Sequence, residues 1–283
     1  RFGRLSENLF SLLVIYSSIY PLQFSQTHFM PSKRIEMPKA PLAIPEASHP
    51  RPDSAAVAPA WHTAGVLLLL LGLVAIGLFL LGGDFINHAH NRALIYAVTM
   101  AIEWLIVAFI ALGARWQGAS LRTLTGGNSP QWRTIALDLG LASTYLVIAN
   151  IVLGILGFIL GHLMHATSDT AIKNFLPHTA SEIALWLLLS LTAGICEEMI
   201  FRGYLQRQFV VWTGNAAAGI ALQGILFGLA HAYQGPTRIL VIAVYGCMFG
   251  SLAYWRKSLR PGMLAHFLQD GIGGIVLSRF MPK

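Results

Sequence analysis

Residues 61–81 read WHTAGVLLLLLGLVAIGLFLL, a run without Asp, Glu, Lys or Arg. A helix needs roughly 20 predominantly apolar residues to cross the hydrocarbon layer of a bilayer. An uninterrupted apolar run of this length is typical of a transmembrane helix. The stretch therefore predicts that the chain crosses a membrane.

Apolar runs of similar length recur toward the C-terminus, separated by short polar segments. Seven spans are predicted, at residues 61–81, 93–114, 139–164, 183–201, 216–231, 239–254 and 262–280. An eighth stays open, because residues 132–164 are too long for one upright span and are polar at Asp138, so that an interfacial helix can precede the crossing one. The expected fold class is all-α, a polytopic transmembrane helical bundle of seven to eight membrane-spanning helices.

Composition supports this class. Of the 283 residues, 55% are hydrophobic and only 11% are charged, against about 25% charged in soluble domains. No polar stretch between the spans is long enough to build a separate core, so residues 61–283 are expected to form one transmembrane domain. The net charge of +7 does not gather on one face, so the lipid bilayer and not a nucleic acid is the expected partner.

Basic residues gather in alternate loops, which predicts an orientation. The richer set is Lys33, Arg34, Lys39, Arg51, Arg115, Arg122, Arg133, Arg207, Arg256, Lys257 and Arg260, and the poorer set is Arg92, Lys173 and Arg238. The positive-inside rule places the N-terminus and the loops after the second, fourth and sixth spans in the cytoplasm. The composition and the lack of a eukaryotic targeting signal favour a bacterial plasma membrane.

The first 60 residues are expected to carry no chemistry. The chain begins with Arg1, and its first methionine is Met30. Residues 1–29 resemble a signal peptide, but the lack of an initiator favours an over-extended reading frame. Residues 31–60 are rich in Pro, Ala and Ser, which predicts a disordered cytoplasmic tail.

Ionisable side chains inside the predicted spans are concentrated in the C-terminal half. Each costs on the order of 2.5–3.5 kcal/mol to insert, so such residues tend to be functional. The candidates are Glu197, Glu198 and Arg202 of the fourth span, His231 of the fifth, and His266 and Asp270 of the seventh. Two further acids, Glu103 and Asp138, either line a water path or pair with a basic loop residue.

Helical geometry divides the two adjacent glutamates. Glu198 and Arg202 are four residues apart, so they share a helix face and can form an ion pair. Glu197 points about 100° away from Glu198, where it is left unpaired and suited to accept a proton. Glu198 and Arg202 therefore have a supporting role, and Glu197 is the candidate base.

A predicted turn relates Glu197 to His231. Residues 213–215, Thr-Gly-Asn, have the composition of a helix stop followed by a new helix. Glu197 and His231 are equally distant from Gly214 along the chain, so in antiparallel helices they lie at the same depth and can face one another. His266 and Asp270 share a face of another helix, where the carboxylate can hold the imidazole in one tautomer.

Together these motifs resemble a known family, the CAAX prenyl protease and bacteriocin-processing (CPBP, Abi) family of intramembrane glutamic endopeptidases. The likeness covers about residues 183–280 and rests on three motifs in order, Glu197-Glu198-x-x-x-Arg202, Phe227-x-x-x-His231 and His266-x-x-x-Asp270. The resemblance implies an endopeptidase without a cofactor or metal, acting on a membrane-associated peptide or protein substrate. That substrate is a prenylated C-terminal tail, a leader peptide or a regulatory membrane protein.

The resemblance also implies a role for each residue. Glu197 and His231 would activate a water for attack on a peptide carbonyl, while His266 and the residue at 270 would stabilise the oxyanion. Well-studied eukaryotic members have Asn where this chain has Asp270, and an ionised Asp cannot donate a hydrogen bond. Asp270 therefore either donates in its protonated form or orients His266.

Two other functions use the same residues. A non-enzymatic scaffold, immunity factor or transporter would keep the polar centre as a structural network or an ion path. A metal-dependent membrane hydrolase would bind a divalent ion through His231, His266 and a carboxylate, which are suitable zinc ligands. Since His266 lies a few residues from the basic loop at 256–260, the site is expected near the cytoplasmic side.

Overall fold

The computed structural model describes residues 56–82, 92–126, 131–164 and 175–280. Every regular element in these ranges is helical, which confirms the all-α class. The predicted disordered or mis-assigned tail at residues 1–60 lies outside the described residues up to position 55.

The helices follow the predicted spans closely. In order, they are α2 (Ala60–Gly82), α3 (Arg92–Trp116), α4 (Leu121–Thr125), α5 (Trp132–Leu163), α7 (Ala180–Glu197), the π-helical segment η2 (Glu198–Leu205), α8 (Gln206–Thr213), α9 (Ala216–Ala230), the 3₁₀ turn η3 (Ala232–Gln234), α10 (Pro236–Arg256) and α11 (Arg260–Phe280). By length and composition, 5 helical runs in the described chain can cross a membrane, namely Ala60–Phe79, Arg92–Trp116, Trp132–Leu163, Ala180–Thr213 and Pro236–Arg256. Helix α9 is apolar but shorter.

Helix α5 is continuous, so the separate interfacial helix proposed before the third span is not present. Asp138, the polar residue that suggested a break, is satisfied without one. Its two carboxylate oxygens accept hydrogen bonds from Arg256 at 3.1 Å and from Arg260 at 2.8 Å. Because these partners come from α10 and α11, the acid fixes α5 to its neighbours while the helix runs on through it.

Local signals explain where the central helices begin and end. Thr179 and Glu182 form a capping box at the start of α7, which satisfies backbone N–H groups that a helix leaves unpaired. Gly214 adopts a φ of 64° after α8, a left-handed conformation that glycine adopts without strain. The Asn215 side chain then caps α9 by accepting from the Ala218 N–H, so the predicted helix stop and turn are confirmed.

The fourth span differs from the prediction in length and in geometry. Helix α7, η2 and α8 form one run from Ala180 to Thr213, whereas a helix ending near residue 201 was expected. Within η2 the Gln206 N–H bonds to the Phe201 carbonyl, five residues earlier. Single π turns inside α-helices are rare and are frequent at functional sites.

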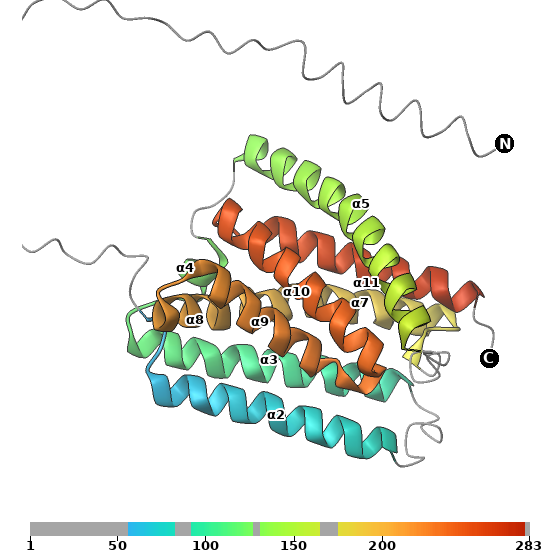
Figure 1. The fold of residues 1–283 in the computed structure, drawn as a ribbon, viewed down its shortest axis with the longest axis horizontal. Helices are drawn as coiled ribbons and strands as arrows, with labels where there is room; N and C mark the ends of the chain where they lie inside the picture. The colour runs from blue at the N-terminus through green and yellow to red at the C-terminus, as the bar shows by residue number, and fades with distance from the viewer. Residues whose placement is uncertain (1–55, 83–91, 127–130, 165–174, 281–283) are drawn as a thin grey trace, which may run out of the picture. The chain divides into compact units, whose positions relative to one another are not determined.

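The helices pack in layers around α7 (Figure 1). Helix α7 contacts α3 on one side and α11 on the other, α9 and α10 form an antiparallel pair, and α5 rests on α10 and α11. The α9–α10 approach is close, because a Cβ on Gly224 would lie only 2.9 Å from the Ala243 carbonyl oxygen. Helix α5 faces outward with exposed Ile151, Ile155 and Phe158, as expected of a lipid-facing helix.

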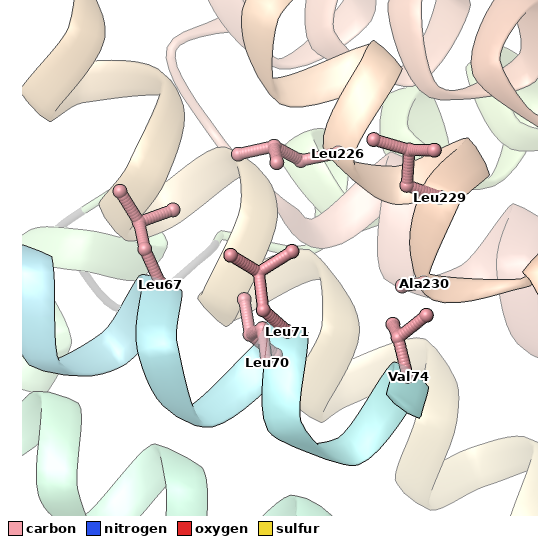
Figure 2. A pocket seen from close by; sticks show the side chains of 7 residues that line it. All are labelled: Leu67, Leu70, Leu71, Val74, Leu226, Leu229 and Ala230. Atoms are coloured by element: carbon pink, nitrogen blue, oxygen red, sulfur yellow. The ribbon is translucent and has the colours of Figure 1, made fainter. Parts of the chain in front are cut away.

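Helix α2 covers η2 and α9. Its His62 and Thr63 contact the Tyr204 hydroxyl at 2.7 and 2.9 Å. One turn onward, the apolar face of α2 points at α9, as Figure 2 shows for Leu67, Leu70, Leu71 and Val74 opposite Leu226, Leu229 and Ala230. The crevice between them measures about 10 Å³, barely room for one water, so this is a packing contact.

Candidate active site

A cavity of about 650 Å³ lies beside the middle of α7. Its wall is formed by α3, α5, α7, α10, α11 and the turn after α9, and most of that wall is apolar. The ionisable residues that line it are Glu103, Glu197, His231, Tyr233, Arg238, Tyr245, His266 and Asp270. All four residues of the predicted catalytic set, Glu197, His231, His266 and Asp270, therefore face one space.

Glu198 and Arg202 form an ion pair behind this cavity. The guanidinium Nη1 lies 3.0 Å from Glu198 Oε1, and both side chains are fully buried. Arg202 also donates to the Gly246 carbonyl at 3.3 Å and stacks 4.2 Å over the Phe227 ring. The pair thus holds η2 against α9 and α10, which fits the supporting role expected from its spacing.

His266 is the centre of the polar network. Its Nδ1 lies 3.4 Å from Glu198 Oε1, and its Nε2 lies 3.4 Å from Asp270 Oδ2 and 3.6 Å from Glu197 Oε2. Both ring nitrogens can donate only when the imidazole is protonated. With carboxylates at both nitrogens the ring is suited to carry a positive charge beside the cavity.

Asp270 contacts the imidazole ring of His266, which lies one helical turn earlier on α11. An oxygen that accepts from His266 Nε2 can orient the ring, which is one of the two roles left open for this residue. Its side chain is 39% exposed, more than the other carboxylates around His266. This exposure keeps Asp270 in contact with the cavity while it holds the ring.

Glu197 lines the cavity and has one carboxylate oxygen that is buried and unsatisfied. Its side chain is 17% exposed, and in the described part of the chain its Oε2 has no hydrogen-bond partner. Among the described contacts of Glu197, the group able to carry a positive charge is the His266 ring, whose Nε2 lies 3.6 Å from Glu197 Oε2. Glu197 is therefore a partly exposed carboxylate whose hydrogen-bonding capacity the described residues do not fill.

His231 ends α9 at the rim of the same cavity. Its Nδ1 donates to the Phe227 carbonyl at 2.8 Å, which in a neutral ring leaves Nε2 as the acceptor. Among the described contacts, His231 and Glu197 share no direct hydrogen bond, so they approach the cavity from α7 and α9 as separate groups.

Tyr233 is a cavity residue that the sequence analysis missed. It lies two residues after His231 in η3, and its hydroxyl accepts from Gln234 Nε2 at 3.0 Å, so its own proton is free to donate. Burial raises the pKa of Tyr233 to about 12, and the phenol stays protonated at neutral pH. A tyrosine at a helix turn carries no periodic signal, although its closeness to His231 in sequence was a usable one.

The two acids outside the predicted set have different positions. Asp138 pairs with Arg256 and Arg260 at one end of the helices, while Glu103 lines the cavity. The two cysteines, Cys196 and Cys247, are not disulfide-bonded. In the described ranges, no group of three or more His, Cys, Asp or Glu side chains is arranged to hold a metal ion.

The cavity extends toward one end of the bundle. Beyond Glu197 its wall continues along the first half of α3 and α7 and the last part of α2 and α11, reaching Gly77, Ile95 and Leu277. The basic residues of the Arg-rich loops lie at the opposite helix ends. The predicted cytoplasmic placement of the site is therefore at odds with the predicted cytoplasmic placement of those loops.

Comparison with known proteins gives one family. Residues 179–272 match the model of the family described as type II CAAX prenyl endopeptidase Rce1-like. The match begins at the N-cap of α7 and ends just after Asp270, so it includes all six predicted site residues and confirms the resemblance drawn from the motifs. No significant match was found among curated proteins or solved structures.

Proposed function

From the match of residues 179–272 to the type II CAAX prenyl endopeptidases, we propose that this chain is an intramembrane endopeptidase. It hydrolyses a peptide bond of a membrane-associated substrate, with Glu197 and His231 activating a water. The observation that carries the proposal is the unpartnered Oε2 of Glu197 in a cavity that His231, His266 and Asp270 also line.

The proposed reaction begins with a water between Glu197 and His231. A carboxylate or imidazole that takes the water's proton raises its nucleophilicity, a contribution typically of about 10²–10⁴-fold. The resulting hydroxide attacks the carbonyl carbon of the scissile bond and places a negative charge on the carbonyl oxygen. Proton donors fixed near that oxygen stabilise the charge more than water does, because they need no reorientation.

His266 and Tyr233 are the groups suited to meet that charge. The His266 ring is held by carboxylates at both nitrogens and supplies positive charge, while the Tyr233 hydroxyl supplies a free proton. Asp270 acts through His266 as a positioning residue. In this proposal the charged His266 ring, held by Asp270, takes the place of an Asn side chain that would donate a hydrogen bond to the oxyanion.

The shape of the cavity limits the substrate. A volume of about 650 Å³ is in the range of small-ligand sites, so it holds a few residues of an extended peptide and not a folded domain. Apolar side chains such as Leu153, Leu189 and Val241 form much of its wall. The proposed substrates are prenylated C-terminal tails, leader peptides and exposed segments of membrane proteins.

The test is cleavage by the purified protein in lipid nanodiscs. Prenylated peptides and leader peptides are incubated with the native protein, with Glu197→Gln and with His231→Ala, and products are identified by mass spectrometry. Glu182→Gln is the matched control, because it removes a carboxylate from α7 outside the cavity and glutamine still completes a capping box. We expect cleavage by the native protein and the control only. Full turnover by both site variants would refute the mechanism.

The cavity also separates the proposed peptidase from a non-enzymatic scaffold, immunity factor or transporter. A structural network would fill the space beside Glu197 with side chains, whereas here the residue lines an open cavity. A metal-dependent hydrolase is separated by chelation. The proposed mechanism predicts that extended dialysis against a chelator leaves turnover unchanged, and loss of turnover that zinc restores would favour the metal mechanism.

A further inference from the structure

Glu103 brings a second unpaired acid into the cavity. It lies on α3, one helical turn after Thr99, and both residues line the cavity wall beside α7. Glu103 is 9% exposed, which makes it the most buried of the three carboxylic acids in that wall. It lies outside residues 179–272, so the family match says nothing about it.

The side chain of Glu103 is not satisfied by the protein. In the described chain its Oε2 is closed to solvent and has no hydrogen-bond partner. Glu197, His266 and Asp270 line the same cavity. Burying a carboxyl group in this way is unfavourable unless the group binds something in the cavity or holds a proton.

Charge balance indicates which groups hold protons. Glu198 is neutralised by Arg202, and Asp270 faces His266. Two carboxyl groups remain in the same low-dielectric space, Glu103 and Glu197. A low-dielectric space accommodates two like charges poorly, so one of these two carboxyl groups is expected to hold a proton.

The other ionisable groups of the wall are His231, Tyr233, Arg238 and Tyr245. Arg238 lies at the start of α10, His231 is bonded to a backbone carbonyl, and the phenols of Tyr233 and Tyr245 are neutral at ordinary pH. The more buried member of a carboxyl pair keeps the proton, because burial penalises the charged form. That member is Glu103.

We propose that Glu103 is the proton donor of the site, the acid that protonates the leaving amine while Glu197 takes the proton of the attacking water. This inference rests on the proposed peptidase function for its chemical step. Pairs of acids in different environments divide the acid and base roles in this way in other enzymes. Here the division follows from two neighbouring helices, α3 and α7, that present their carboxyl groups to one cavity.

The step balances with the protein's own groups. Water loses a proton to Glu197 with His231, and its oxygen bonds to the carbonyl carbon. The carbon–nitrogen bond then breaks, and the amine nitrogen takes the proton of Glu103. The proton held by Glu197 returns to Glu103 through cavity water, which leaves a carboxylic acid, an amine and the starting enzyme.

The first experiment tests, without a substrate, whether Glu103 is protonated. Infrared spectra of purified native protein and of Glu103→Gln are compared at neutral pH. We expect the native spectrum to contain the C=O stretch of a protonated carboxyl group that the variant lacks. A native spectrum without this band would overturn the inference, whether or not the protein cleaves peptides.

The second experiment measures the kinetics of peptide cleavage and their dependence on pH. Glu103→Gln should lower kcat by about 100-fold or more with little change in KM, and the remaining activity should lose the alkaline fall of its pH profile. Glu103→Asp should keep that fall. Glu182→Gln is the matched control, since it makes the same carboxylate-to-amide change outside the cavity, and it should behave as the native protein.

The outcomes separate this inference from the proposed function. If the native protein shows the infrared band but cleaves no peptide, the peptidase proposal fails and the protonated Glu103 stands. If it cleaves peptides and Glu103→Gln retains the native kcat and pH profile, the donor role fails and the peptidase stands. Thermal unfolding of each variant in the same nanodiscs shows whether a loss reflects misfolding.

Discussion

Asp270 shows how one atom changes the role of a residue. As a carboxylate it accepts from His266 Nε2, at 3.4 Å, and it donates nothing to a substrate. An amide at this position can still accept from the ring through its oxygen while its NH₂ group donates to an oxyanion.

Replacing Asp270 by Asn should therefore preserve turnover, whereas Asp270→Leu should reduce kcat/KM by about 100-fold, within the range seen when an oxyanion contact is lost. The comparison is made on one peptide substrate at saturating and limiting concentrations. If the Asn variant is as inactive as the Leu variant, the negative charge at 270 is itself required.

The buried pair of Glu198 and Arg202 makes a prediction about stability. Removing one member leaves the other as an uncompensated buried charge, which costs about 3–5 kcal/mol. Arg202→Met should therefore unfold at a clearly lower temperature than the native protein. The double variant Glu198→Gln, Arg202→Met should recover part of the loss, because both charges are gone, and a double variant less stable than Arg202→Met would contradict the pairing.

Close packing between α9 and α10 positions His231 and η3. A Cβ on Gly246 would lie 2.9 Å from Gly224 Cα and 3.1 Å from the Phe227 ring. Gly246→Ala should destabilise the protein by about 1–3 kcal/mol through overpacking and lower turnover by displacing His231.

Gly140 supplies the control for that prediction, because a Cβ there has no neighbour within 4 Å. Gly140→Ala on α5 should be neutral or slightly stabilising, by about 0.5–1 kcal/mol. Thermal unfolding and peptide cleavage are measured for both variants. Equal effects of the two substitutions would show that the α9–α10 contact has no special weight.

Local sequence patterns predicted where the helices begin and end better than they predicted which helices contact one another. Apolar length located the helices, and the residues at 213–215 predicted the turn that brings Glu197 and His231 to one cavity. The π-helical turns of η2 were not predictable, since no residue type marks the extra residue per turn. Glu103 was recognised as an unusual acid, but its place in the cavity depends on the contact between α3 and α7, which are far apart in sequence.

The basic loops and the cavity lie toward opposite ends of the helical bundle. The positive-inside rule counts the Arg-rich loops near Arg133 and Arg256 as cytoplasmic. The cavity, however, extends toward the opposite helix ends, which include Gln234 of η3. His266 is close to the basic loop along the chain, but the open space beside its ring runs away from that loop.

If the basic loops are cytoplasmic, the cavity opens on the outer face. In a chain with Cys196 and Cys247 replaced by Ala, a small membrane-impermeant thiol reagent should then label Gln234→Cys in intact cells and Arg133→Cys only in inverted vesicles. Cleavage of an externally added peptide by intact cells should accompany the first result. Residues 133 and 234 lie at opposite ends of the helical bundle. Labelling of Arg133→Cys from outside and of Gln234→Cys from inside would therefore place the cavity on the cytoplasmic side.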